Sequence, residues 1–442
     1  MPAALAWLAT AEDCFADDYG SLRQGLLTSV FSLVVGVERV FHLDEMEDSG
    51  FAWLCGGRRA PSRHTVGAWR RHLSWYEVDA FCRRTFPWHL LRNEDALVSY
   101  DEHTIPRWTR KFHIGKGYVT TRNKYMRCEK LFTGFDVGSG RFLFLRGTPG
   151  NCNLQDLAVP LMQQTLRQGR PRNLHALFDA GAGKSDASVR QLWDLAEQHP
   201  NLDVTLRACR YPHRMRAWKQ LPSGLFVSVE EPGVCVGAAP KEVRLAETQT
   251  VLKGESPEQA IRTIVCREVR PGPKKDRWHP LYTTSEVESF PAHEVLSIFR
   301  ARQSHEQGHR VEVHDLFANA VPCGYDKESP DRNRPRFHRG PLQMIGWLTA
   351  LVYNAVADLA QALGQDHWGD HVRTVRRKFL NRPGQLYETP EAVIVHLDPF
   401  AGQDELLPVI DDLNSGHHRL PWLDNRRLVL SLTPRPEARD GP

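Results

Sequence analysis

The stretch ALVSYDEHTI, residues 96–105, decides how the rest of the chain is interpreted. Its first half is apolar and rich in residues that favour strands, and Asp101 follows where this strand is expected to end. A second apolar run, NLHALFDAG at 173–181, places Asp179 in the same way. Two strands that each end on an aspartate predict an acidic edge of a sheet, provided that the two strands are neighbours.

The elements around these two runs alternate between extended and helical patterns. They are a hairpin with a Gly-Ser-Gly turn, two helices and a further strand, expected at residues 130–151, 153–169, 185–199 and 203–209. The order is strand, strand, strand, helix, strand, helix, strand. It predicts an α/β fold with a ribonuclease H-like mixed sheet and helices on both faces. The first and fourth strands are neighbours in that order, so Asp101 and Asp179 should lie side by side.

The domain organisation follows from changes in these patterns along the chain. The first 92 residues have apolar positions at helical spacing, and short strand-like runs follow residue 210. A helix that contains Glu306 is expected from about Pro291. The expected segments are a helical N-terminal DNA-binding domain at 1–92, the first part of a catalytic core at 93–209, a β-rich insertion at 210–290, the second part of the core at 291–365, and a C-terminal region for DNA or dimer contacts at 366–442.

Net charge and cysteine usage limit the partners and the cellular compartment that are expected. The 442-residue chain has a formal net charge of +4, so basic surfaces must be sought in local clusters. The 9 cysteines are scattered without a C-x-x-C pair, which favours reduced thiols in a cytoplasm over disulfides or a structural zinc site. No signal peptide is expected, because acidic residues appear early. The apolar stretch 344–363 contains Asn354 and Asp358, so a core helix is expected there and no membrane association.

Residues 303–314 read QSHEQGHRVEVH and contain the pattern H-E-x-x-H at His305, Glu306 and His309. On a helix, two histidines four residues apart share a face and bind zinc, while the glutamate polarises a water molecule. The surrounding sequence is polar and lacks the H-x-x-G-x-x-H extension, so the pattern has low specificity here. A zinc metalloprotease is therefore the less favoured alternative, because Glu306 also fits a different set of residues.

Three carboxylates are expected to converge at one edge of the sheet. Asp101 and Asp179 end their strands, and Glu306 lies on a helix that returns to the sheet. Carboxylates so placed repel one another unless cations neutralise them, and hard oxygen ligands suit Mg²⁺ or Mn²⁺. Two such ions would activate an attacking oxygen and stabilise the leaving one in phosphoryl transfer at a nucleic-acid backbone. A single strand-end aspartate is more often a turn or cap residue, so the interpretation depends on all three.

These motifs resemble those of the DDE transposases of bacterial insertion sequences, in the branch with a Tyr-x2-Arg-x3-Glu-x6-Lys signature. Phe299, Arg302 and Glu306 match its first three elements in spacing, with phenylalanine in place of tyrosine. Val313 stands where the signature has lysine, and Arg310 is a candidate replacement for its phosphate contact. The runs SYDEHTI and FDAGAGKS resemble the two aspartate motifs of the family, and YTTS resembles the strand before the glutamate helix.

The resemblance implies a DNA transposase in which Asp101, Asp179 and Glu306 bind two Mg²⁺ or Mn²⁺ ions. Water would nick the transposon ends, and the freed 3′-OH would attack target DNA. The implied partners are transposon terminal inverted repeats and target DNA, bound by a homodimer that acts on paired ends through hairpin intermediates. The implied location is the nucleoid in a bacterial cytoplasm. The departures at Phe299 and Val313 leave open a domesticated or inactive relative that binds DNA without cutting it.

Basic residues gather where DNA contacts are expected. A helix-turn-helix pattern begins at residue 56, a basic and aromatic stretch spans 106–130, and a third basic group lies at 373–378. Solvated surfaces explain the first two nearly as well. A core position is the favoured interpretation of Trp278, and Arg302 could equally be an i+4 partner of Glu306. The residues expected to contact DNA are Phe299, Arg302, Arg310, Trp278, Arg63, Arg70, Arg71, Arg110, Lys111, Lys116, Arg122, Lys124, Arg376 and Arg377.

Overall fold

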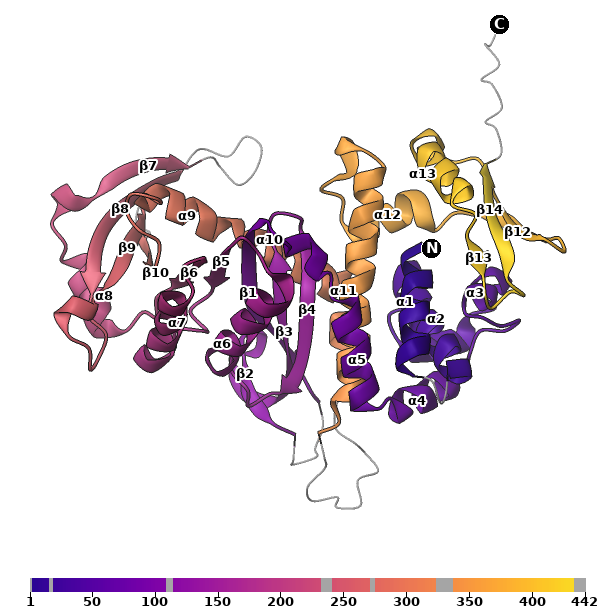
Figure 1. The fold of residues 1–442 in the computed structure, drawn as a ribbon, viewed down its shortest axis with the longest axis horizontal. Helices are drawn as coiled ribbons and strands as arrows, with labels where there is room; N and C mark the ends of the chain where they lie inside the picture. Colours follow the sequence, from indigo (N-terminus) through magenta and orange to yellow (C-terminus); the bar gives the residue numbers. More distant parts are fainter. Residues whose placement is uncertain are drawn as a thin grey trace, which may run out of the picture.

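The computed structural model describes residues 2–15, 19–108, 114–231, 241–270, 275–322 and 337–432. Arg110 and Lys111, which were predicted to contact DNA, lie outside these residues. Figure 1 shows an elongated molecule. A large sheet with its helices forms one half, and the N-terminal helices and a small C-terminal sheet form the other. Helix α11 (Arg339–Ala362) lies between the two halves.

The N-terminal region is helical, as its apolar spacing predicts. Its helices are α1 (Pro2–Cys14), α2 (Tyr19–Val35), α3 (Ser49–Leu54), α4 (Arg63–His72) and α5 (Trp75–Thr85). Ser62 caps α4, because its hydroxyl oxygen accepts a hydrogen bond from the Thr65 amide at 3.3 Å. Trp347 of α11 donates from its indole nitrogen to Thr85 Oγ1 at 2.7 Å. This bond joins the end of α5 to the central helix.

The central sheet is mixed, as predicted. Its first strands are β1 (Asp95–Pro106), β2 (Lys116–Val119), β3 (Lys124–Asp136), β4 (Arg141–Pro149), β5 (Asn173–Phe178) and β6 (Leu202–Arg207). β1 pairs antiparallel with β3 and parallel with β5, and β6 lies parallel beside β5. β4 pairs with β3 across the predicted hairpin turn. The parallel pairing of β1 with β5 ends at Tyr100 and Phe178, so the next residues, Asp101 and Asp179, lie side by side. β1 itself continues to Pro106, paired with β3, and does not end at Asp101 as predicted.

Helices cover both faces of this sheet because successive strand residues point in opposite directions. Phe132 on β3 belongs to a core cluster with residues of α6 (Leu154–Gln164) and α7 (Asp186–Gln198). Phe135, three residues further along, belongs to a second cluster with residues of α11. Among the described helices, α11 alone is long and apolar enough to cross a membrane, and 72% of its most apolar window is buried inside the protein. It occupies the place of the predicted core helix.

The segment predicted as a β-rich insertion is rich in strands, but it does not form a sheet of its own. Its elements are α8 (Pro212–Lys219), β7 (Val227–Glu231), β8 (Lys241–Thr250), β9 (Ile261–Glu268) and β10 (Arg277–Thr283). β10 pairs antiparallel with β6, and β9, β8 and β7 follow in order. The joint is buried, with Tyr282 opposite Leu206 and a 2.9 Å hydrogen bond between the hydroxyls of Thr283 and Thr205. The central sheet therefore continues through this segment.

The helix expected from about Pro291 is interrupted at Arg302. α9 (Ala292–Ala301) and α10 (Gln303–His314) are separated by this single residue, which has a turn conformation. The Arg302 amide bonds to the carbonyl of Phe299, three residues back, at 3.3 Å. A bond to the third preceding residue tightens the backbone and changes the direction of the side chain. The Arg302 side chain reaches Asp101 on β1, as described below.

The C-terminal region packs against the N-terminal helices. It contains α12 (Val372–Val375), α13 (Gln403–Ser415) and a sheet of β11 (Gly384–Glu388), β12 (Ala392–Leu397), β14 (Arg426–Leu432) and β13 (Arg419–Leu420). Arg376 is buried and donates to the backbone carbonyls of Val34 at 2.7 Å, Leu33 at 2.8 Å and Asp315 at 2.9 Å. The prediction that Arg376 contacts DNA is therefore wrong, since its guanidinium is taken up inside the protein.

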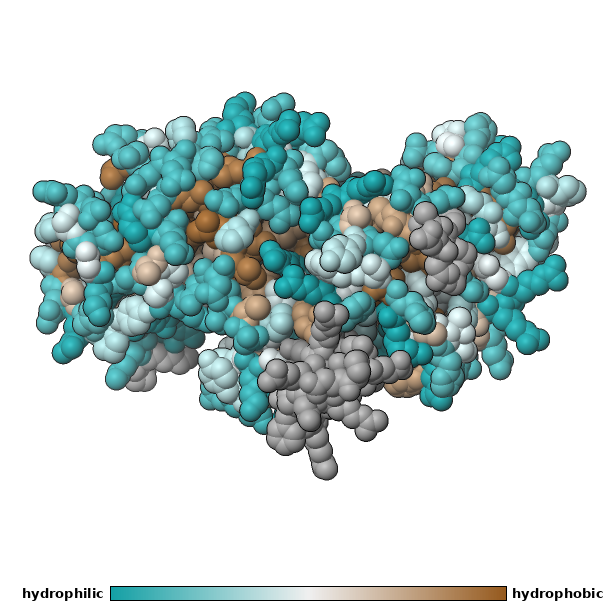
Figure 2. Space-filling model, turned by 60° about the horizontal axis from the view of Figure 1, so that its bottom comes forward, coloured by the Kyte–Doolittle hydropathy of each residue, from teal (hydrophilic) through white to brown (hydrophobic). Residues whose placement is uncertain are grey.

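Hydrophilic residues cover most of the face shown in Figure 2, with smaller hydrophobic patches among them.

Candidate active site

Asp101 and Asp179 lie at neighbouring positions where two parallel strands meet. Tyr100 on β1 is opposite Phe178 on β5, so each aspartate follows one member of that pair. The Asp101 side chain is 20% exposed and the Asp179 side chain is 39% exposed, so both can be reached from the surface. The strand order thus gives the two aspartates the adjacency that the sequence predicts.

Arg302 connects the carboxylates at this edge. Only 8% of its side chain is exposed, and one guanidinium nitrogen donates to Asp101 Oδ2 at 3.0 Å. Another guanidinium nitrogen donates to a carboxylate oxygen of Glu306. Burial lowers the pKa of Arg302, but the charges of Asp101, Asp179 and Glu306 outweigh burial and raise it. The three predicted carboxylates therefore act on one buried cation, Asp101 and Glu306 by contact and Asp179 through its charge.

The surroundings of Asp101 disfavour its ionised form. Burial raises the pKa of Asp101, and the charge of Asp179 raises it further. His309, Arg302 and the Glu102 amide, which donates to Oδ1 at 2.8 Å, act in the opposite direction without cancelling burial. A divalent cation at this carboxylate would favour the ionised form.

The three carboxylates are of the donor type that suits a hard divalent cation. Among the described residues, however, the three ligand atoms that lie within 4.8 Å of one another belong to Asp101, His305 and His309, and not to Asp179 or Glu306. Asp179 Oδ1 is buried and, among the described residues, has no hydrogen-bond partner. Its one recorded ion pair is with Arg207 at 3.6 Å. A buried oxygen of this kind is costly unless a cation or water molecule takes up its lone pairs. Together with Asp101 and Glu306 it gives an all-oxygen donor set, which is what Mg²⁺ and Mn²⁺ prefer.

The two histidines of the H-E-x-x-H pattern face the sheet and bond to hydroxyl groups. His305 is fully buried, with Nδ1 2.8 Å from Ser99 Oγ and Nε2 3.0 Å from Thr133 Oγ1. His309 Nε2 lies 3.0 Å from the same threonine oxygen, and its Nδ1 lies 3.1 Å from Glu312 Oε2. All four ring nitrogens therefore have partners within the protein.

The pKa shifts of His309 and His305 agree with the hydrogen bonds that the two rings form. Burial lowers the pKa of His309, but the bond to Glu312 and the charge of Asp101 raise it overall. Burial lowers the pKa of His305 well below its ordinary value, and the neighbouring His309 adds to that shift. A protonated His309 donates to Glu312 and Thr133, and the Thr133 hydroxyl then donates to a neutral His305. Zinc binding would require each ring to give up one of these bonds, because a histidine binds a metal through one ring nitrogen.

A possible metal site nevertheless includes both histidines. One ligand atom each from Asp101, His305 and His309 lie within 4.8 Å of one another. This arrangement puts the H-E-x-x-H histidines next to the first aspartate, which the sequence pattern does not reveal. It differs from the predicted zinc site, because the glutamate of the pattern is bonded to Arg302.

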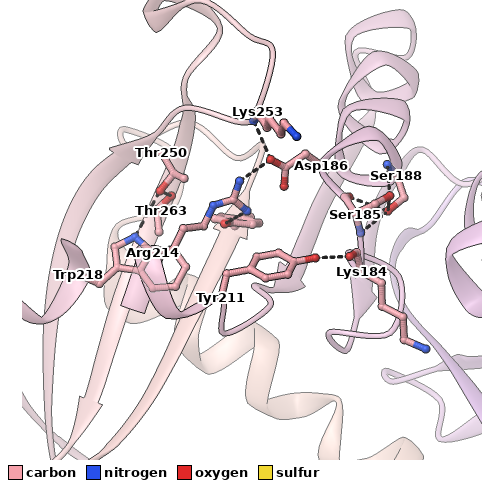
Figure 3. A network of polar contacts seen from close by, with 11 residues as sticks. Lys184, Ser185, Asp186, Ser188, Tyr211, Arg214, Trp218, Thr250, Lys253 and Thr263 are labelled. Carbon is pink, nitrogen blue, oxygen red and sulfur yellow. Dashed lines mark hydrogen bonds and ion pairs between the residues drawn. The ribbon is translucent and has the colours of Figure 1, made fainter. Parts of the chain in front are cut away.

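A polar network fixes the loop that follows Asp179 (Figure 3). Ser185 begins α7, and its hydroxyl oxygen accepts from the Ser188 amide at 3.1 Å, as predicted for a helix cap. Asp186 pairs with Arg214 of α8 at 2.5 Å and accepts from the Lys253 amide at 2.6 Å. The Tyr211 hydroxyl donates to the carbonyl of Lys184. The network ties the loop to α8 and to the end of β8, so the sheet extension supports the position of Asp179.

The residues that bond to the two histidines were not predicted from the sequence. Ser99 and Thr133 are fully buried polar residues within apolar strands, and that contrast is the available signal. Glu312 is also buried, one turn of α10 beyond His309. The partners of Ser99 and Thr133 lie more than 170 positions away along the chain, as for Thr133 and His305 with a separation of 172. Spacing along a sequence does not predict contacts of this kind.

The other predicted DNA contacts differ in exposure. Trp278 is partly buried and packs against Phe226 at a ring separation of 6.0 Å, which matches the alternative of a core tryptophan. Phe299 is also partly buried, with the Arg302 guanidinium 5.8 Å from its ring. Arg70 is half-buried. The predicted residues that are exposed are Arg63, Arg71, Lys116, Arg122, Lys124, Arg310 and Arg377.

Comparison with known proteins gives a distant structural likeness. No protein-family model matches the chain, and no curated protein matches it. Among solved structures, the chain is similar to a piggyBac transposase in a synaptic complex with hairpin DNA, at a TM-score of 0.42 and 11% sequence identity. The match covers 81% of this chain and 70% of that chain. A likeness at this level assigns neither a family nor a function, so side-chain geometry has to carry the functional argument.

Proposed function

We propose that this protein is a DNA transposase that cleaves strands at transposon ends and joins 3′-OH ends to target DNA. The observation that carries the proposal is that Arg302 bonds to both Asp101 and Glu306, while Asp179 follows the neighbouring parallel strand beside Asp101. The order β4, β3, β1, β5, β6 supports a ribonuclease H-like core, because it sets the two aspartates side by side.

In this proposal Asp101, Asp179 and Glu306 hold two Mg²⁺ or Mn²⁺ ions. Such ions activate the attacking oxygen and stabilise the leaving oxygen of an in-line displacement. Asp179 supplies a buried oxygen that has no described hydrogen-bond partner, and Asp101 supplies a carboxylate whose charged form needs a cation. Arg302 orients Asp101 and Glu306 by direct bonds. His305 positions α10 against β1 and β3 through its bonds to Ser99 and Thr133.

The DNA surface in this proposal includes the hairpin of β2 and β3 and the exposed side of α4. Arg122 and Lys124 lie 5.4 Å and 5.8 Å from the ring of Trp108, so cationic and aromatic groups are combined there. Such a combination suits phosphates with neighbouring bases. Action as a homodimer on paired ends, and a place in the bacterial nucleoid, are parts of the same proposal.

Two other functions are kept as alternatives. A transposase-derived protein that binds DNA without cutting it would keep the basic surfaces and need no metal. A hydrolase with a metal at Asp101, His305 and His309 is favoured by the proximity of their ligand atoms within 4.8 Å. The last alternative makes the histidines indispensable, whereas the transposase proposal makes the three carboxylates indispensable.

The test is cleavage of plasmid DNA that carries the sequences flanking the gene for this chain, with Mg²⁺ or Mn²⁺ and with an EDTA control. Asp101→Asn, Asp179→Asn and Glu306→Gln should each abolish cleavage and leave DNA binding nearly intact, because the carboxylates hold metal and the basic surfaces hold DNA. Glu288→Gln, at an exposed carboxylate outside the site, is the matched control and should cleave as the unaltered protein does.

The double variant His305→Ala and His309→Ala separates the two metal sites. Loss of packing should lower cleavage in that variant without removing it, provided that the protein remains folded by circular dichroism. The transposase proposal is wrong if the double variant loses a stoichiometric zinc ion and all activity while Asp101→Asn stays active. Intact DNA binding without metal-dependent cleavage by the unaltered protein would favour the non-cutting alternative.

A further inference from the structure

A pocket of about 610 Å³ lies between the N-terminal helices and the end of β1. Residues of α2, of α4 and of the turn Val40–Glu45 form part of its wall. The end of β1 and the segment after it, the segment after α10, and Ile345 and Thr349 of α11 also line it. The volume is in the range of sites that bind nucleotides and other small molecules. None of Asp101, Asp179 or Glu306 lines it, so it is distinct from the carboxylate site.

Three polar atoms that line this pocket lack a hydrogen bond. Ser29 Oγ, Ser32 Oγ and Arg70 Nε are each buried and have no partner among the described residues. Ser29 is 3% exposed, and Ser32 follows it by one turn on the same face of α2. Buried polar groups in proteins are almost always paired, so three unpaired atoms around one pocket point to a ligand.

Arg70 also lacks a counter-charge. Burial lowers the pKa of Arg70 to about 10, and no neighbouring charge contributes to the shift. The guanidinium therefore remains protonated at neutral pH. The other arginines of the wall are engaged, Arg63 with Asp44 at 3.0 Å and Arg107 with Glu129 at 2.6 Å. A half-buried cation without a described carboxylate is costly, and an anion in the pocket would remove that cost.

We propose that this pocket binds a phosphate group. The Arg70 guanidinium is its charged donor, and the Ser29 and Ser32 hydroxyls are its neutral donors. A phosphate accepts several hydrogen bonds at once and pairs well with the planar guanidinium of arginine. Trp108, 71% exposed at the wall of the pocket, offers a face for the base of the same nucleotide. The phosphate site stands on its own geometry, whereas DNA as the source of the phosphate rests on the proposed function.

The first measurement is thermal unfolding of the full chain in sodium phosphate and in sodium chloride at equal ionic strength. Phosphate should raise the melting temperature of the unaltered protein, because a ligand that binds only the folded state stabilises it. Arg70→Gln should lose this rise. Arg216→Gln should keep it, since Arg216 is exposed on α8 and does not line the pocket.

The double variant Ser29→Ala and Ser32→Ala separates loss of the site from loss of the fold. Without phosphate it should melt at or above the temperature of the unaltered protein, because two buried unpaired hydroxyls are removed. In phosphate it should gain less than the unaltered protein gains. This result would assign the hydroxyls to the ligand even if Arg70→Gln folds poorly.

The second measurement is the salt dependence of duplex DNA binding in EDTA, where cleavage plays no part. Losing one phosphate contact lowers the slope of log K against log salt concentration by about 0.9. Arg70→Gln should show this change, and Arg216→Gln should not. A changed slope identifies DNA as the source, and phosphate stabilisation with an unchanged slope identifies a free phosphate or nucleotide. If phosphate does not stabilise the unaltered protein and Arg70→Gln leaves the slope unchanged, the proposal is overturned.

Discussion

The positive charge of Arg302 offsets the negative charges of Asp101, Asp179 and Glu306, which would otherwise repel one another. Its direct bonds reach Asp101 on β1, which lies 201 positions away along the chain, and Glu306 on α10. The match of Arg302 to a family signature gave its position, and the i+4 spacing to Glu306 gave one of its partners. The bond to Asp101 spans 201 positions of the chain, so the sequence pattern does not show it.

Replacing Arg302 by glutamine should lower the free energy of unfolding by about 1–3 kcal/mol without metal, because a charged hydrogen bond to a buried carboxylate is lost. Added MgCl₂ should restore more stability to this variant than it adds to the unaltered protein, since a cation takes over the charge balance. Urea unfolding with and without MgCl₂ measures both effects. Arg83→Gln, which breaks an exposed i+4 pair with Asp79, is the control and should cost about 0.3–0.5 kcal/mol. Equal losses in the two variants would contradict this account of Arg302.

At the scale of elements, the start of α7 determines how firmly the loop after Asp179 is placed. Asp186 receives bonds from Arg214 and from the Lys253 amide. Burial raises the pKa of Asp186, but these partners outweigh it and lower the pKa overall. A lowered carboxyl pKa stabilises the fold above the ordinary aspartate pKa of about 4, and this stabilisation is lost as the pH falls through the lowered value.

Asp186→Asn should therefore cost stability at pH 7, by about 1–3 kcal/mol, and the difference from the unaltered protein should shrink as the pH falls below about 4. Cleavage should fall as well, because the loop beside Asp179 loosens. Chemical unfolding over a pH series gives the first result, and the plasmid assay gives the second. The control is Asp194→Asn on the same helix, where Asp194 forms an i+4 pair with Arg190. A constant difference across the pH series would show that Asp186 does not act through its charge.

Most elements could be predicted from local patterns, whereas their assembly could not. The apolar, strand-favouring residues at 96–100 and the caps Ser62 and Ser185 are local signals, and the structure has a strand or a helix start at each. The pairing of β10 with β6 depends on which buried residues meet across the chain, such as Tyr282 and Leu206. Strand-like runs look the same whether they form a separate sheet or extend an existing one. That is why the segment from 210 to 290 was expected to stand apart.

At the scale of the whole molecule, the N-terminal and C-terminal regions are joined by buried polar contacts. Arg376 donates to the carbonyls of Leu33 and Val34 at the end of α2 and to that of Asp315 at the end of α10. The indole nitrogen of Trp422 donates to the carbonyl of Trp53 at 3.1 Å. A basic cluster in the sequence predicted a DNA surface here, because composition alone does not distinguish a buried arginine from an exposed one.

Arg376→Met should lower the free energy of unfolding by about 2–4 kcal/mol, since carbonyl groups that it bonds lose a charged donor. The loss should appear as one cooperative transition, because the side chain ties together helices from both halves. Arg377→Met is the matched control, since Arg377 is the exposed neighbour, and it should change stability by less than about 0.5 kcal/mol. Urea unfolding followed by circular dichroism compares the two. A large loss in the control, or a second transition in Arg376→Met alone, would contradict a single joined unit.

The continuous sheet also bears on how such a chain can change over evolutionary time. β7 is the last strand on its side of the sheet, and the carboxylate edge lies between β1 and β5, several strands away. Each added or deleted hairpin at the β7 border would lengthen or shorten the sheet by about 4.8 Å per strand without altering the register of β1 against β5. The border is thus a place where relatives can differ in length and still keep the same chemistry. Variation in size among such proteins should collect between β6 and α9.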